Sequence, residues 1–82
     1  MRVISKRRLR EFWEKFPESK TPLENWYRTA KKAGWENIVD VRESFRHADI
    51  FNDCVIFNVG GNKFRLIVKF RFSRNKVYIR FA

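Results

Sequence analysis

Apolar side chains recur at helical spacing in the first part of the chain. One stripe has members at positions i, i+3, i+4 and i+7, namely Leu9, Phe12, Trp13 and Phe16. This spacing predicts a first helix over residues 6–16, with Ser5 as its N-cap and Pro17 as its end. The preceding Arg2–Ile4 segment is predicted to be a short edge strand.

A second helical stripe follows after a short connection and consists of Leu23, Trp26, Tyr27 and Ala30. Thr21 and Glu24 have the spacing of a capping box, with Pro22 at the first helical position, and Gly34 is predicted to end the helix. Two helices of similar length with a short connection are expected to form an antiparallel hairpin that packs on one face of a sheet.

The segment from residue 35 to 53 has the weakest pattern. Residues 37–41 are predicted to be a short extended segment, and residues 42–48 to contain a helical turn. His47, the one histidine of the chain, is expected to be a solvated loop residue rather than a catalytic base.

From Cys54 onward the apolar period changes from 3.6 to 2, which is typical of strands. The pattern predicts three antiparallel strands over residues 54–59, 62–72 and 76–81. Gly60-Gly61 is the expected first turn, and Ser73-Arg74-Asn75 contains the second. Helices followed by strands indicate an α+β fold, a helical hairpin on a small, mainly antiparallel sheet, and we expect residues 1–82 to form a single domain.

The register of this sheet follows from keeping its two faces consistent. Two-residue turns would pair Phe57 with Phe64, and Phe72 with Val77. On the other face they would pair Asn58 with Lys63, and Lys69 with Arg80. Because like charges placed opposite each other destabilise a sheet, an anion bound there would relieve the strain between Lys69 and Arg80.

Charge is unevenly distributed along the chain, whose formal net charge is +10. Residues 54–82 contain seven Lys or Arg and no Asp or Glu. One face of the predicted sheet collects the side chains of Lys63, Arg65, Lys69, Arg71, Lys76, Tyr78 and Arg80. Ile56 and Ile67 add apolar surface on which an unstacked base could rest. The pattern therefore favours nucleic-acid binding, most of all RNA, over an ordinary solvated sheet face.

The remaining composition indicates the cellular compartment of the protein and its need for cofactors. A lone Cys54 inside an apolar run is typical of a buried, reduced thiol. No apolar segment approaches membrane-spanning length, and no signal-peptide core follows Met1. We expect a cytoplasmic protein with no metal or small-molecule cofactor, because zinc spacing and phosphate-binding glycine patterns are missing from the sequence.

The run Val55-Ile56-Phe57-Asn58-Val59-Gly60-Gly61-Asn62-Lys63-Phe64-Arg65-Leu66 resembles the signature of HigB-type toxins, members of the RelE-like superfamily of messenger-RNA interferases. The resemblance continues through Val77-Tyr78-Ile79-Arg80-Phe81, and it extends to the helical half through Trp26, Trp35 and Asp40-Val41-Arg42.

This resemblance implies a toxin of a type II toxin–antitoxin system, an endoribonuclease that cleaves messenger RNA, often on the ribosome. It also implies neutralisation by a HigA-type helix-turn-helix antitoxin. By position, Arg65 and Arg80 would be the catalytic arginines that stabilise charge on the phosphoryl group, with Lys63 supporting substrate binding. Lys69, Arg71, Lys76 and Tyr78 complete the expected RNA-binding set.

The resemblance ends at Ala82. Family members usually continue with a short tail that contains Thr-His and Glu-Tyr-Asp, and its His and Tyr are natural general acids or bases. An alternative is therefore a non-catalytic protein that binds RNA or an antitoxin through a degenerate toxin site.

Overall fold

The structure is a computed structural model, and it describes residues 1–51, 54–61 and 63–81. Three α-helices, two short 3₁₀ turns and five strands follow one another along these residues. In chain order they are β1 (Arg2–Ile4), α1 (Lys6–Lys15), η1 (Pro17–Ser19), α2 (Lys20–Lys32), α3 (Ile38–Ser44), β2 (Asp49–Phe51), β3 (Cys54–Val59), β4 (Phe64–Arg71), η2 (Phe72–Arg74) and β5 (Lys76–Phe81).

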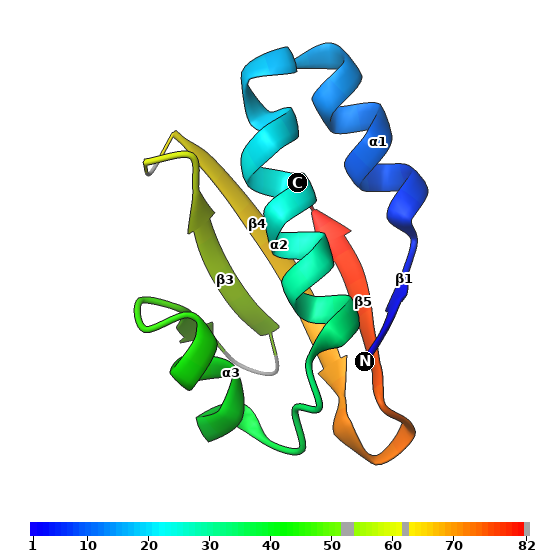
Figure 1. Ribbon diagram of the computed structural model, residues 1–82, viewed down its shortest axis with the longest axis vertical. Coiled ribbons are helices and arrows are strands. Elements are labelled where there is room, and N and C mark those ends of the chain that lie inside the picture. The colour runs from blue at the N-terminus through cyan, green and yellow to red at the C-terminus, as the bar shows by residue number, and fades with distance from the viewer. Residues whose placement is uncertain (52–53, 62, 82) are drawn as a thin grey trace.

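The strands form one five-stranded sheet in the order β1-β5-β4-β3-β2. All neighbours are antiparallel except β1, which pairs in parallel with β5 at the edge. Helices α1 and α2 run in opposite directions, and they lie on the same side of the sheet (Figure 1). This arrangement confirms the predicted α+β class and the helical hairpin, and it leaves the opposite face of the sheet open.

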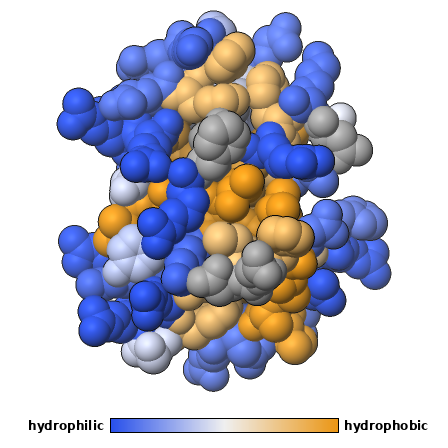
Figure 2. Space-filling view, turned by 180° about the vertical axis from the view of Figure 1, so that it is seen from behind, coloured by the Kyte–Doolittle hydropathy of each residue, from blue (hydrophilic) through white to orange (hydrophobic). Residues whose placement is uncertain are grey.

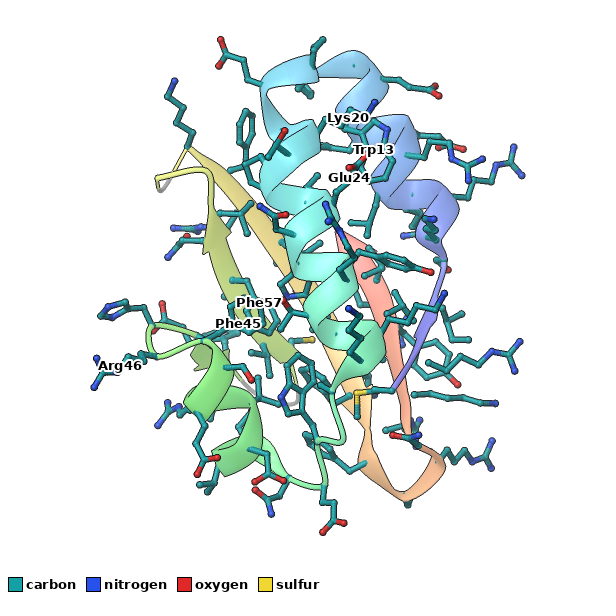
Figure 3. The ribbon with its side chains drawn as sticks, viewed as in Figure 1. Trp13, Lys20, Glu24, Phe45, Arg46 and Phe57 are labelled. Atoms are coloured by element: carbon teal, nitrogen blue, oxygen red, sulfur yellow. The ribbon has the colours of Figure 1, made fainter. Side chains whose placement is uncertain are left out.

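The core lies between the helices and the covered face of the sheet, and it is rich in aromatic residues. Trp26 of α2 packs edge-on against Phe57 of β3, with 5.5 Å between ring centroids. Phe45, just after α3, contacts the same Phe57 ring at 5.1 Å, as Figure 3 shows. The central residues of β4, Leu66 and Val68, are fully buried. The alternation predicted for this strand is therefore confirmed on its core side.

Both helix starts differ in detail from the predictions. Ser5 is the N-cap of α1, but its backbone is left-handed (φ 74°) and its hydroxyl makes no capping bond. Helix α2 begins at Lys20 rather than after Thr21, and its N-cap is the buried Ser19, whose hydroxyl donates to the Phe16 carbonyl at 2.7 Å. The capping box across Thr21 and Glu24 does not form because both residues already lie inside the helix.

The prediction for residues 37–41 was wrong, because Ile38–Ser44 is helix α3. The Asn37 side chain accepts a hydrogen bond from the Asp40 backbone amide at 3.1 Å, and an Asn cap of this kind starts a helix. Val41, on the inner side of α3, is fully buried. The apolar run Ile38-Val39 therefore belongs to a short amphipathic helix, not to a strand.

The strand registers keep the predicted parity but are shifted by two residues. Phe57 lies opposite Leu66, not Phe64, and Phe70 lies opposite Val77, not Ile79. Each turn therefore has four residues rather than two. Asn62, the predicted first residue of the long strand, lies outside the described residues, and β4 starts at Phe64. None of the helices in the described part of the chain combines the length and apolar character needed to cross a membrane.

Candidate nucleic-acid interface on the open sheet face

The uncovered face of the sheet carries an apolar band bordered by hydrophilic side chains, as Figure 2 shows from behind. Register places Ile67 of β4 beside Ile56 of β3 on this face, and Ile4 of β1 beside Tyr78 of β5. These residues are partly exposed. The face is therefore not uniformly basic. It offers an apolar surface with cations around it, which is the composition that suits stacked bases and a phosphate backbone.

A trough of about 300 Å³ lies on the β5 side of this face and is lined by Arg71, Arg74, Tyr78 and Arg80. Tyr78 is partly buried, whereas the three arginines are exposed. Among the described residues, none of the three guanidinium groups has a hydrogen-bond or ion-pair partner. Three such guanidinium groups in one trough with a phenol ring have the charge and the geometry that suit an anion.

Arg80 occupies an irregularity in the strand pairing. Val68 pairs with Ile79, but the next residue back along β4, Ile67, pairs with Phe81, so Arg80 is an extra residue of β5. A bulge of this type redirects a side chain and is common beside functional sites. From α1, Arg8 donates to the Arg80 carbonyl at 3.0 Å from its Nη1. The bulge is therefore tied to the helical layer.

The like-charge contact on this face differs from the predicted one. Lys69 lies opposite Tyr78, so the predicted pairing of Lys69 with Arg80 is wrong. The observed like-charged neighbours are Arg71 and Lys76, and Arg2 of β1 lies on the other side of Lys76. The two-residue shift of register moves the charge repulsion to the turn end of β5, where Arg2, Lys76 and Arg71 form a row of three cations.

Arg65 shares the open face but does not line the trough. It is exposed, and it lies opposite Asn58, the position predicted for Lys63. Two residues further along β4, Ile67 pairs with Phe81, the residue that follows Arg80. Arg65 and Arg80 therefore lie toward the same end of the sheet.

Lys63 departs furthest from its predicted position. It lies in the turn before β4, and its Nζ is 3.6 Å from Oε2 of Glu18 in the connection between α1 and α2. Both side chains are largely exposed. Lys63 is thus held toward the helical layer instead of joining the row of cations on the open face.

His47 is exposed, as predicted, and it lies between α3 and β2. Its neighbour Arg46 points away from the body of the molecule in Figure 3. His47 also borders a second hollow of about 310 Å³, together with Phe57 and Asn58. It lies outside the trough that contains Arg80.

The sequence did not predict three basic residues at or beside the candidate interface: Arg2, Arg8 and Arg74. Arg74 was placed in a turn and given no role, although the turn borders the trough. Arg2 lies in β1, before the helices, and Arg8 lies in α1. Their approach to β5 depends on the parallel pairing of β1, and no local pattern signals that contact.

The fold and the interface together define a small basic α+β protein with a cluster of cations on one sheet face. Residues 19–82 match the HigB toxin family, described as the RelE-like toxic component of a toxin–antitoxin system. The chain is also 31% identical to the mRNA interferase toxin HigB of Escherichia coli K12 over 83 aligned residues, covering 98% of this chain and 80% of that protein. The mRNA interferase HigB of Shigella flexneri matches at the same identity and coverage.

A further mRNA interferase HigB, from Escherichia coli O6:H1, is 28% identical over 98% of the chain and 81% of its own length. The chain belongs to the HigB family of RelE-like toxins. The family predicted from the Phe57–Arg65 and Tyr78–Arg80 motifs is thereby confirmed.

Proposed function

We propose that this protein is the toxin of a type II toxin–antitoxin system and that it cleaves messenger RNA on the open face of its sheet. The observation that carries the proposal is the trough lined by Arg71, Arg74, Tyr78 and Arg80, whose guanidinium groups have no partner among the described residues. The names of the relatives, all mRNA interferases, support the same substrate.

The chemistry that fits this site is intramolecular phosphoryl transfer. The ribose 2′-oxygen loses its proton and attacks the adjacent phosphorus, the bond from phosphorus to the 5′-oxygen breaks, and a proton is delivered to that oxygen. Negative charge grows on the phosphoryl oxygens during attack. Guanidinium groups fixed around the phosphate stabilise that charge through bidentate hydrogen bonds.

Arg80 has the best position for this role because it lines the trough and its backbone is fixed by the bulge and by Arg8. Arg65 would bind the phosphoryl group or the next phosphate from the same end of the sheet. Tyr78, which is partly buried and lines the same trough, would hold a base or sugar. Lys69 and Lys76 would add positive charge along β4 and β5.

The partner that neutralises the toxin would be a HigA-type helix-turn-helix antitoxin, and the substrate would be messenger RNA on the ribosome. An acidic antitoxin segment could occupy the cations of the open face directly. That occupation would block RNA by competition for the same charges.

Growth arrest on induced expression tests the proposal in cells. Wild type should arrest growth, and the Arg65→Ala/Arg80→Ala double variant should not, because loss of one phosphate-stabilising group costs on the order of a hundredfold or more in rate. The matched control is Arg28→Ala/Lys32→Ala, which removes the same charge from exposed positions of α2. Equal arrest by wild type and the Arg65/Arg80 variant would refute the proposed site.

An adjacent reading frame for a small helix-turn-helix protein, whose co-expression relieves the arrest, would support the antitoxin assignment.

A further inference from the structure

The trough extends beyond the arginine assigned to the cleaved phosphate. Arg80 lies at one end of β5, and Lys76 lies four residues away at the other. At about 3.3 Å per residue, these positions are about 13 Å apart along the strand. A single phosphate held by Arg80 would therefore leave the cations at the turn end of β5 without a counter-charge from the residues that the structure describes.

Several like charges lie close together at that turn end. Arg71 lies directly opposite Lys76, and Arg2 lies beside Lys76 on the other side. Direct opposition of like charges destabilises strand pairing. The side chain of Arg74 adds a fourth cation, because it lines the trough together with Arg71. Such an arrangement is stabilised by an anion placed between these groups.

The turn that carries Arg74 is held firmly in place. Phe72 stacks on Phe70, with ring centroids 5.0 Å apart and an interplanar angle of 2°. The Asn75 amide donates to the Phe72 carbonyl at 3.1 Å, and the Asn75 carbonyl accepts from the Arg2 amide at 2.9 Å. Arg74 therefore projects from a turn anchored by an aromatic stack and by β1. A preorganised cation binds an anion with a smaller entropy cost than one on a loose loop.

We propose that Arg71 and Arg74 form a second phosphate subsite, adjacent to Tyr78, that binds the RNA backbone next to the cleaved bond. This inference rests on the proposed function. It adds that the site binds at least two neighbouring phosphates of the RNA. The strand would run along β5, with the cleaved phosphate at Arg80 and a neighbouring phosphate at Arg71 and Arg74. Tyr78 between them would contact the intervening nucleoside.

RNA is favoured over an acidic protein segment as the occupant of this subsite. The trough ends in cations on both sides of an aromatic ring, and apolar Ile4 and Ile67 lie on the same open face. Alternation of guanidinium and aromatic groups matches the alternation of phosphate and base in a single strand. An acidic peptide would satisfy the cations but would leave the partly buried Tyr78 ring without a base to stack on it.

The test separates binding at this subsite from chemistry at Arg80. Fluorescence anisotropy would measure binding of an eight-nucleotide 2′-O-methyl RNA, which cannot be cleaved, across a range of salt concentrations. For Arg71→Ala/Arg74→Ala, the slope of log K against log salt should become shallower by about 0.7 for each phosphate that the variant no longer neutralises. Arg74→Lys should keep the slope, and Arg28→Ala/Lys32→Ala should behave as wild type.

A kinetic comparison completes the test. With a cleavable RNA of the same length, the Arg71/Arg74 variant should show a KM raised about tenfold and a nearly unchanged kcat. Cleavage of a dinucleotide with a single phosphate should be slowed less by the variant than cleavage of the eight-nucleotide RNA. Thermal unfolding of each variant would establish that it is folded.

Four results would overturn the inference. An unchanged salt slope in the variant, together with RNA cleavage by wild type, would remove the second subsite and leave the proposed function intact. A fall in kcat at constant KM would place Arg71 and Arg74 at the reacting phosphate instead. An unchanged RNA slope combined with weaker binding of the antitoxin would assign these arginines to the protein partner. Failure of the wild-type protein to bind RNA at all would refute both the subsite and the function on which it rests.

Discussion

Arg8 of α1 donates a hydrogen bond from its guanidinium to the backbone carbonyl of Arg80, at 3.0 Å. The two residues are 72 positions apart in the chain, and the bond joins the helical layer to the bulge on which the proposed catalytic arginine stands. Arg8 contacts the backbone of Arg80 and does not line the trough, so we expect it to act as a positioning residue for Arg80.

Replacing Arg8 with Ala should lower kcat by roughly threefold to tenfold, since a hydrogen bond of this kind contributes on the order of 1 kcal/mol. KM should change little, because the charges that line the trough remain. Steady-state cleavage of a short RNA gives both parameters. Arg7→Ala is the control, since the Arg7 side chain pairs with Glu11 on the exposed surface of α1. A rise in KM with constant kcat would show that Arg8 binds RNA directly.

The turn between β3 and β4 offers a graded test of backbone geometry. A Cβ on Gly60 would lie 3.1 Å from Cδ2 of Phe64 and 3.4 Å from Cγ of Pro22, at a φ of +63°. Gly61 has a similar φ of +65°, but a Cβ there meets no atom within 4 Å. Gly34 has neither constraint.

Alanine substitutions should therefore destabilise the protein in the order Gly60, Gly61, Gly34. The left-handed backbone costs about 1 kcal/mol for a residue with a Cβ, and the Phe64 contact adds to this at Gly60 alone. Gly34→Ala should be neutral or slightly stabilising. Urea unfolding of the three variants measures the order. Equal losses of stability at Gly60 and Gly61 would show that the Phe64 ring moves aside freely.

The buried indole of Trp26 combines good packing with an unmet polar group. Trp26 is 1% exposed and its ring contacts Phe57, and its Nε1 has no hydrogen-bond partner within the described part of the chain. Trp26→Ala should cost about 3–5 kcal/mol through the cavity it leaves. Trp26→Phe should cost much less than that, because removing the N–H also removes a buried donor without a partner. A loss of stability in Trp26→Phe as large as in Trp26→Ala, measured by chemical denaturation, would contradict this explanation.

Lys63 provides a comparison with the cations of the trough. Because it is paired with Glu18 toward the helical layer, Lys63→Ala should weaken RNA binding by less than Arg71→Ala does. The ion pair itself is exposed, so Glu18→Gln should change the free energy of unfolding by at most about 1 kcal/mol. Anisotropy with the same uncleavable RNA compares the two alanine variants. A larger effect at Lys63 would mean that RNA follows the β3–β4 turn instead of β5.

The period of the apolar residues was sufficient to predict both long helices, the change to strands and the face on which each strand residue lies. It did not set the turn lengths. Moving one residue from each flanking strand into a turn lengthens the turn by two residues and leaves every side chain on the same face of the sheet. The four-residue turn before Lys76 depends on the Phe70–Phe72 stack and on the left-handed Asn75 (φ 55°). Those are properties of packing and backbone conformation that alternation does not encode.

The same limit applies to the site. Tyr78 and Arg80 were predicted to share a face because they are two residues apart on one strand, and both line the trough. Arg74 was missed because turn residues follow no alternation. Arg2 was missed because its neighbours on β5 are more than 70 residues away in sequence. Helix α3 was missed because its single stripe is too short to establish a period, and its start depends on the Asn37 cap.

In vitro cleavage tests most directly whether the open face of the sheet cleaves RNA. Purified protein would be incubated with a short end-labelled RNA, and the product ends would be analysed for 2′,3′-cyclic phosphate. Wild type and Arg28→Ala/Lys32→Ala should give this product at equal rates, and Arg80→Ala should be slower by a factor on the order of a hundred. Intact RNA with wild-type protein, or equal cleavage by Arg80→Ala, would contradict the account.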